Sequence, residues 1–192
     1  NPNPNPNPNP SPIPYPHQVR VQLDRQLSRD VASYRLPWEY ASVEALLGRV
    51  RTQHGPLRVI VHAAGVLADA LLAKQDTESM AAVWGPKAAG AWYLHKHTVG
   101  VDLELGVFML FSSLSALFGN RSQANYCAAN EYLDELACWR TSQGLLTVSV
   151  QWPFVSGVGM VGSVDMKGFE KYSVDLARLS HITKSIVSGA SM

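Results

Sequence analysis

Residues 105–152 read LGVFMLFSSLSALFGNRSQANYCAANEYLDELACWRTSQGLLTVSVQW. The apolar stretches 105–112 and 145–152 predict two buried strands, and residues 122–143 between them predict a helix that ends at Gly144. Strands that are apolar on both faces and are joined by a crossover helix are typical of a parallel sheet. This stretch therefore predicts an α/β fold.

The same alternation extends toward the N-terminus. Residues 57–62 (LRVIVH) predict another buried strand, and alternation over 19–23 predicts a short one. Residues 42–53 predict a helix with Ser42 as its N-cap and Gly55-Pro56 as its stop. A long helix is expected from an N-cap at Asp76 or Thr77 to about His97, and Gly85-Pro86 must kink or break it. We therefore expect a parallel sheet covered by helices on both faces.

Composition excludes several classes of protein. The 192 residues carry a formal charge of +1, which gives no basic surface for nucleic acid or an anionic membrane. No apolar run reaches the roughly 18 to 20 residues of a membrane span, and the two cysteines and six histidines show no disulfide or metal spacing. We expect a cytoplasmic protein without metal, nucleic acid or membrane partners.

The chain divides into three parts by composition. Residues 1–16, NPNPNPNPNPSPIPYP, predict a disordered lead, which is either a proline-rich ligand or a tail without a role. Residues 17–160 are expected to form one α/β domain, and residues 161–192 a partial substrate lid or a tail.

Polar side chains gather where ligands bind in such folds, beyond the carboxyl ends of the strands. Ser113 follows the strand at 105–112, and Tyr126 and Asn130 lie four residues apart on one face of the next helix. If Lys87 reaches this pocket, its charge lowers the pKa of the Tyr126 phenol, as a general acid near pH 7 requires.

Four stretches carry a resemblance to a known family: VIVHAAGVLADALL (59–72), WGPKAAGAWYLHKHT (84–98), FMLFSSLSALFGNRSQANYCAANEYLDELACWR (108–140) and TVSVQWPFVSGVGM (147–160). They resemble the ketoreductase domain of modular polyketide synthases and type I fatty acid synthases, a branch of the short-chain dehydrogenase/reductase superfamily. The resemblance covers about residues 30–160. It implies a Rossmann-like doubly wound parallel sheet and NADPH-dependent reduction of a β-ketoacyl thioester. It also implies two kinds of partner, an acyl carrier protein that delivers this substrate and neighbouring synthase domains.

The resemblance also implies catalytic roles. Tyr126 would donate a proton to the ketone oxygen, and Ser113 would hydrogen-bond the same oxygen. Lys87 would lower the pKa of the phenol and hold the nicotinamide ribose, while Asn130 would support a chain of water molecules that resupplies protons.

Further matches concern binding. The residues implied to contact the cofactor, besides Lys87 and Tyr126, are Asp30, Val31, Ala63, Ala64 and Gly65. Leu67 and Asp69 match a Leu-Asp-Asp loop associated with the stereochemistry of the hydroxyl product, and the kept Asp69 favours the D-hydroxy product. Asp69 is equally well interpreted as a loop cap.

One departure from the family pattern leaves alternatives open. No Gly-x-Gly-x-x-Gly loop lies near the start of the chain, where it would bind a pyrophosphate, and Gly157-Val158-Gly159 comes too late and in the wrong element. The sheet is therefore expected to be incomplete at its N-terminal edge, without the first strand and this loop, and at its C-terminal edge. The chain is then either a reductase or a non-catalytic fragment. A stand-alone short-chain reductase is a third reading, against which Asn130 and Lys87 argue, since ordinary members carry Tyr-x-x-x-Lys.

Overall fold

The computed structural model describes residues 18–22, 31–35, 40–102, 104–155 and 173–189, the first two ranges as backbone alone. They contain a five-stranded sheet in the order β2-β1-β3-β4-β5. The strands are β1 (Gln18–Gln22), β2 (Val31–Arg35), β3 (Val59–His62), β4 (Val107–Ser113) and β5 (Thr147–Trp152). β3, β4 and β5 run parallel, so the parallel sheet predicted for these three strands is confirmed.

The strand predicted at 19–23 is present as β1, but its direction differs from the prediction. β1 pairs antiparallel with β3 on one side and with β2 on the other. Residues 23–30 between β1 and β2 are too few for a crossover helix, so these two neighbours are antiparallel. β1 also runs opposite to β3, so its carboxyl end lies at the opposite end of the sheet from those of β3, β4 and β5.

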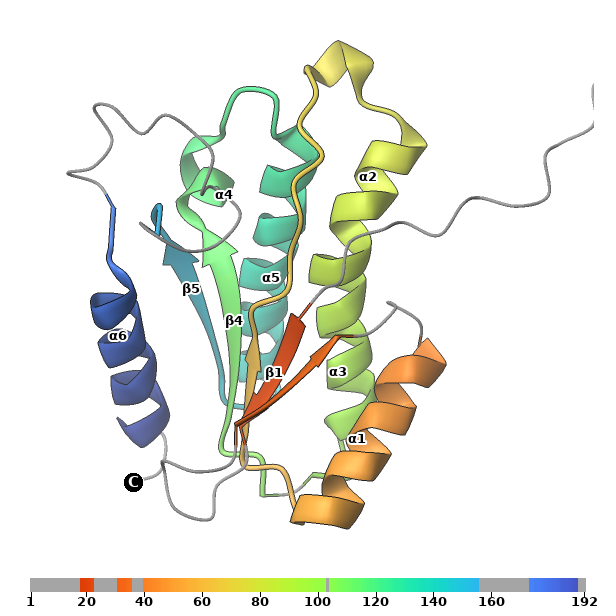
Figure 1. Ribbon diagram of the computed structural model, residues 1–192, viewed down its shortest axis with the longest axis vertical. Helices are drawn as coiled ribbons and strands as arrows, with labels where there is room; N and C mark the ends of the chain where they lie inside the picture. Colours follow the sequence, from red (N-terminus) through yellow and green to blue (C-terminus); the bar gives the residue numbers. More distant parts are fainter. Residues whose placement is uncertain (1–17, 23–30, 36–39, 103, 156–172, 190–192) are drawn as a thin grey trace, which may run out of the picture.

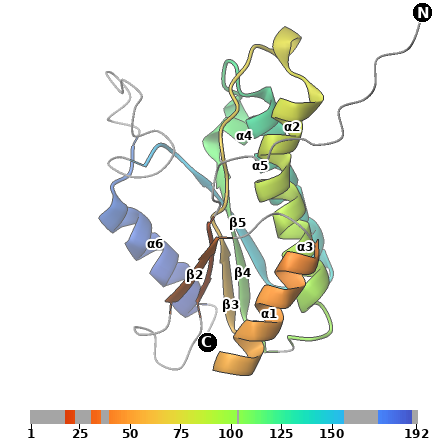
Figure 2. The same cartoon turned by 45° about the vertical axis from the view of Figure 1, so that its right-hand side comes forward.

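Helices cover both faces of the sheet, as expected for a doubly wound fold. α1 (Tyr40–His54), α3 (Gly90–Thr98) and α5 (Ala124–Ser142) lie on one face, and α6 (Leu176–Gly189) lies on the other (Figures 1 and 2). α2 (Thr77–Trp84) continues the line of α3, and two short elements, η1 (Leu72–Lys74) and α4 (Leu114–Phe118), lie near the carboxyl ends of the parallel strands (Figure 1). None of the described helices is long and apolar enough to cross a membrane.

Two apolar cores result from the alternation of side chains along the strands. On β4, Phe108 and Leu110 join the cluster beneath α1, α3 and α5, whereas Val107 and Met109 join the cluster beneath α6. α6 contributes Val187, which is 3% exposed. α6 thus packs on the sheet, and whether residues 161–192 also form a substrate lid stays a prediction.

Helix ends agree with the sequence except at one position. Asp76 is the N-cap of α2, where its carboxylate accepts a hydrogen bond from Ser79 N at 2.8 Å. Gly144 adopts φ 76° after α5, a left-handed conformation that favours glycine. The predicted N-cap Ser42 is wrong, because α1 begins at Tyr40 and includes it.

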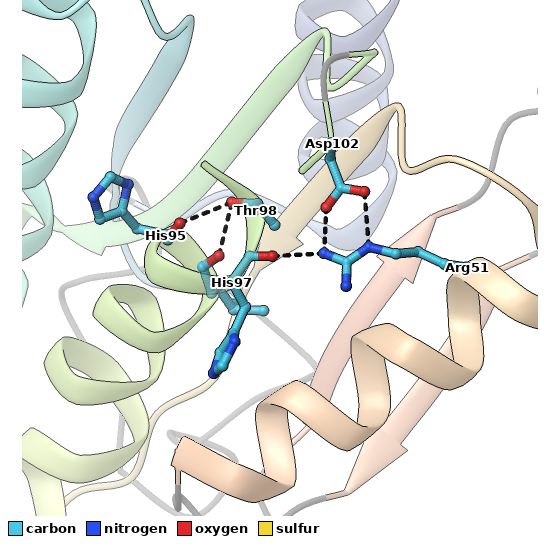
Figure 3. A network of polar contacts seen from close by, with 6 residues as sticks. Arg51, His95, His97, Thr98 and Asp102 are labelled. Carbon is cyan, nitrogen blue, oxygen red and sulfur yellow. Dashed lines mark hydrogen bonds and ion pairs between the residues drawn. The ribbon is translucent and has the colours of Figure 1, made fainter. Parts of the chain in front are cut away.

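A buried ion pair joins α1 to the turn after α3 (Figure 3). Arg51 Nε and Nη2 donate to the two carboxylate oxygens of Asp102 at 2.9 and 2.6 Å, and Nη2 also donates to the His97 carbonyl at 2.6 Å. The Asp102 side chain is 2% exposed and that of Arg51 is 25% exposed. The pair holds the C-terminal part of α1 to the turn that follows α3.

Candidate active site

Lys87 lies in the turn that Gly85-Pro86 imposes between α2 and α3. Residues Gly85–Ala89 (η2) form one turn of π-helix, in which Gly90 N donates to Gly85 O, five residues back. Because Pro86 has no amide hydrogen, the regular α-helical ladder cannot run through this point, and a wider turn results. The turn directs Lys87 inward, where it is 3% exposed.

The amine of Lys87 is held at the end of β4. Its Nζ donates to the Phe111 carbonyl at 2.9 Å and lies 5.2 Å from the centroid of the Tyr126 ring. The Lys87 carbonyl is in turn bound by Nε2 of the buried His62 at 2.9 Å, so both ends of the residue are fixed. Burial lowers the pKa of the amine from 10.5 to about 7, an effect that the charge of Asp134 opposes. Near pH 7 this lysine therefore exists in both its charged and its neutral form.

Tyr126 and Asn130 project from one face of α5, as their spacing predicted. The pKa of the Tyr126 phenol is raised above 10, chiefly by burial, while the nearby side chains of Asn130 and Ser113 lower it in part. The expected lowering of this pKa below 10 is not what the structure shows, because the effect of burial is larger than that of the groups that lower it. The phenol therefore keeps its proton at neutral pH.

Asn130 is fully buried beside the phenol. Its amide Nδ2 donates to the Tyr126 carbonyl at 2.8 Å, and its Oδ1 has no hydrogen-bond partner within 3.5 Å. The side chain thus influences Tyr126 by proximity, while a buried acceptor is left available. A buried oxygen of this kind is ordinarily satisfied by water or a ligand.

Ser113 lies at the junction of β4 and α4. It is the last residue of β4 and the N-cap of α4, and its Oγ accepts from Ser115 N at 3.2 Å and from Ser115 Oγ at 2.9 Å. Since both contacts use Ser113 as the acceptor, its own hydroxyl hydrogen remains available to a second acceptor. Lys87, Ser113, Tyr126 and Asn130, from three separate stretches of chain, are thus brought together at the carboxyl ends of the parallel strands.

The segment after β3 passes directly against Lys87. A Cβ on Gly65 would lie 3.0 Å from Lys87 Cε and 3.6 Å from its Nζ, so a side chain here would displace the lysine. Of the neighbouring small residues, Ala64 is buried and Ala63 is exposed. Gly65 therefore lets the backbone after β3 lie close against Lys87.

Residues 67–70 are tied to the start of α5. The exposed carboxylate of Asp69 accepts from Gln123 Nε2 at 3.1 and 3.2 Å, and Ala70 N donates to Ser122 O at 2.8 Å. The buried Asn125 donates to the Ala68 carbonyl at 2.8 Å. Leu67 and Asp69, two of the residues expected near substrate, are thereby placed beside the helix that carries Tyr126.

A carboxylate that sequence reasoning missed lies behind these residues. Asp134 accepts hydrogen bonds from Ser112 and Gln151, each at 2.9 Å, and from Ser149. The signal was present in the sequence, because the spacing of four from Tyr126 to Asn130 continues to Asp134. Among the described residues no group of His, Cys, Asp and Glu is arranged to hold a metal ion.

Comparison with known families identifies this arrangement. A model of the KR domain matches residues 27–157, most of the chain. The chain belongs to the KR domain family. KR domains of polyketide synthases are ketoreductases, which are oxidoreductases that reduce a keto group.

Relatives place this KR domain among polyketide synthases. It is 43% identical over 136 residues to the spectinabilin polyketide synthase system protein NorB of Streptomyces orinoci, covering 70% of this chain and 6% of that protein. It is 39% identical over 140 residues to the phenolphthiocerol synthesis polyketide synthase Pks15/1 of Mycobacterium marinum, covering 72% of this chain and 6% of that one. The chain therefore spans a small part of the length of these synthases.

A solved structure agrees with the fold. The ketoreductase PlmKR1, from the first module of phoslactomycin biosynthesis in Streptomyces sp. HK803, superimposes with a TM-score of 0.69 at 32% identity. The match covers 78% of this chain and 35% of that one. The Rossmann-like assignment is thereby confirmed for this KR domain.

Of the two neighbouring residues expected to contact the cofactor before β3, the structure describes only Val31, and that as backbone alone. Val31 begins β2, the edge strand, and β1 separates it from β3. Asp30 lies outside the described residues. Their role in cofactor binding stays a prediction.

Proposed function

We propose that this KR domain reduces a β-ketoacyl thioester to the β-hydroxyacyl thioester with NADPH as reductant. The observation that carries the proposal is the convergence of Lys87, Ser113, Tyr126 and Asn130 at the carboxyl end of β4. Their chemistry suits a carbonyl that gains a proton as hydride arrives. Two of them carry a hydroxyl, one an amine and one an amide.

Tyr126 is the proposed proton donor to the ketone oxygen. Its phenol is protonated at neutral pH, because burial raises its pKa. Ser113 holds the same oxygen with its hydroxyl hydrogen, since Ser115 N and Ser115 Oγ donate to Ser113 Oγ and leave that hydrogen for another acceptor. Hydrogen-bond donors fixed before the reaction stabilise the charge that develops on the oxygen, by about 3 kcal/mol for one such donor.

Lys87 and Asn130 are proposed to act on Tyr126, the proton donor. The charged form of Lys87 favours the phenolate left after proton transfer, because it lies 5.2 Å from the ring centroid. The partnerless Oδ1 of Asn130 accepts a hydrogen bond from water, which then relays a proton toward Tyr126. Both residues therefore act before and after the transfer rather than on the ketone itself.

The residues present fit the nicotinamide and ribose part of NADPH. Gly65 lacks a Cβ where one would lie 3.0 Å from Lys87 Cε, so the backbone after β3 lies close against the lysine that we assign to the ribose. We assign Ala63, Ala64 and Gly65 to the wall against which the cofactor lies, and Lys87 to its ribose hydroxyls. When bound, NADPH supplies the hydride.

The proposed substrate is carried by an acyl carrier protein, with neighbouring synthase domains as further partners in the cytoplasm. Support comes from the relatives, which are polyketide synthases. Leu67 and Asp69 lie beside the start of α5, where they would contact the acyl chain. We keep the D-hydroxy product as the proposed stereochemistry, on the ground of Asp69.

The proposal is tested by following NADPH oxidation with a small model ketone such as a decalone. Because no glycine-rich loop precedes β3 in the sequence, the assay uses both this chain and a hybrid in which it replaces the matching part of a complete relative. Tyr126→Phe is expected to abolish turnover, and Tyr132→Phe, a half-buried tyrosine on the same helix, is expected to retain it. Turnover that survives Tyr126→Phe would show that another group donates the proton.

A non-catalytic role remains the second candidate, and one observation favours it. The strand beside β3 is antiparallel, so its carboxyl end does not lie beside the carboxyl ends of β3, β4 and β5. Titration of the chain with NADPH, followed by nucleotide fluorescence, separates the candidates. Saturable binding that Lys87→Met weakens supports the reductase, and no binding in either chain or hybrid supports the non-catalytic role.

A further inference from the structure

Asp134 occupies the next position on the helical stripe of Tyr126 and Asn130. Its half-buried carboxylate lies between α5 and the ends of two strands. Oδ2 accepts from Ser112 Oγ and from Gln151 Nε2, each at 2.9 Å, and Oδ1 accepts from Ser149 Oγ. Three donors from β4 and β5 therefore fix one carboxylate in a single orientation.

The carboxylate is connected to Lys87 through the end of β4. Ser112, which Asp134 binds, directly follows Phe111, whose carbonyl accepts the hydrogen bond from Lys87 Nζ. Movement of Asp134 would therefore move the residue next to the acceptor of the amine. A chain of contacts thus runs from α5 through the strand end to the lysine.

Charge gives a second connection between the same two residues. Burial lowers the pKa of Lys87 to about 7, and the negative charge of Asp134 opposes this lowering. The other titratable groups that face Lys87 are Tyr126, whose phenol keeps its proton, and His62, whose pKa burial lowers to about 4. Both are uncharged near pH 7, so Asp134 supplies the anion.

We propose that Asp134 is a positioning residue of this site, which fixes the strand end that binds Lys87 and supports the charged form of its amine. The meaning of this role for catalysis rests on the function proposed above. The coupling between the two side chains does not, because it is a property of the chain without cofactor or substrate. If Asp134 only held α5 against the sheet, its replacement would leave the titration of Lys87 unchanged.

The test is a pH titration of Lys87 in the full chain, followed by NMR of protein labelled with ¹³C-lysine. Lys87→Met identifies the Lys87 resonance by its loss. Asp134→Asn and Asp134→Ser both remove the charge, and two replacements are used so that the test survives if one does not fold. Glu135→Gln removes the same charge from the adjacent, exposed residue of α5 and is the matched control.

We expect both neutral replacements to lower the midpoint of Lys87 by about one pH unit, while Glu135→Gln leaves it in place. An unchanged midpoint in a folded Asp134 variant, or an equal shift in Glu135→Gln, would overturn the proposal. NADPH affinity at pH 8 is the second measurement, and we expect it to fall several-fold in the Asp134 variants alone. If NADPH does not bind at all, the proposed function fails, while the titration still decides the coupling.

Discussion

Replacement of Lys87 by methionine should make the protein more stable while removing its proposed function. The unfolded chain keeps the ordinary lysine pKa near 10.5, whereas in the folded protein it is about 7. Between these values the unfolded state holds one more proton, so the free energy of unfolding rises with pH by about 1.4 kcal/mol per unit. The charged lysine therefore costs the native protein roughly 3–5 kcal/mol at pH 7, and Lys87→Met removes this cost.

Urea unfolding followed by tryptophan fluorescence at pH 7, 8 and 9 measures the effect. The advantage of Lys87→Met over the native chain should be greatest at pH 7 and shrink by about 1.4 kcal/mol with each unit. Lys74→Met, which replaces an exposed lysine in η1, is the control and should give no such trend. The reasoning is refuted if the native chain and Lys87→Met show parallel pH dependence over this range.

Three further expectations concern neighbouring features. Arg51→Gln should lower the free energy of unfolding by about 3 kcal/mol, because it leaves the buried carboxylate of Asp102 unpaired. Asp102→Asn should lower it by only about 1 kcal/mol, because Arg51 is partly exposed and can turn to water. Equal losses for the two variants in urea unfolding would contradict this difference. Gly65→Ala should weaken NADPH binding in a fluorescence titration, because the added Cβ displaces Lys87. An unchanged dissociation constant would show that the close contact between Gly65 and Lys87 does not matter for NADPH binding. Gly48 lies at an exposed position inside α1, with nothing within 4 Å of an added Cβ. Gly48→Ala should therefore raise the free energy of unfolding by about 1 kcal/mol and leave NADPH binding unchanged. A loss of stability in thermal melting would contradict this expectation.

The core of the fold could be predicted because its elements are long and strongly patterned. β3, β4, β5 and α5 lie within a few residues of their predicted bounds. The direction of β1 was not accessible in this way, since alternation indicates a strand and not the neighbour with which it pairs. α4 was missed because its five residues are too few to show a helical period.

The site could be predicted where it depends on spacing within one helix and not where it depends on contacts. The shared face of Tyr126 and Asn130 follows from their separation of four residues. The acceptor of Lys87 is a backbone carbonyl, which every residue carries and no sequence pattern marks. The direction of the Tyr126 pKa depends on burial, which became visible only once the elements were packed together.

The π-helical turn at Gly85–Ala89 constrains the number of residues between α2 and α3 as strictly as it constrains their identity. A π turn contains one residue more than the α-helical turn it replaces, and this extra residue lets the chain pass Pro86 while α2 continues the line of α3. Deletion of a single residue here, such as Ala89, would remove this extra residue and force Pro86 into an α-helical turn, in which it has no amide hydrogen to donate. The turn that directs Lys87 inward would then be lost. Relatives in which this lysine has the same role should therefore differ from this chain between residues 77 and 98 by substitutions and not by insertions or deletions.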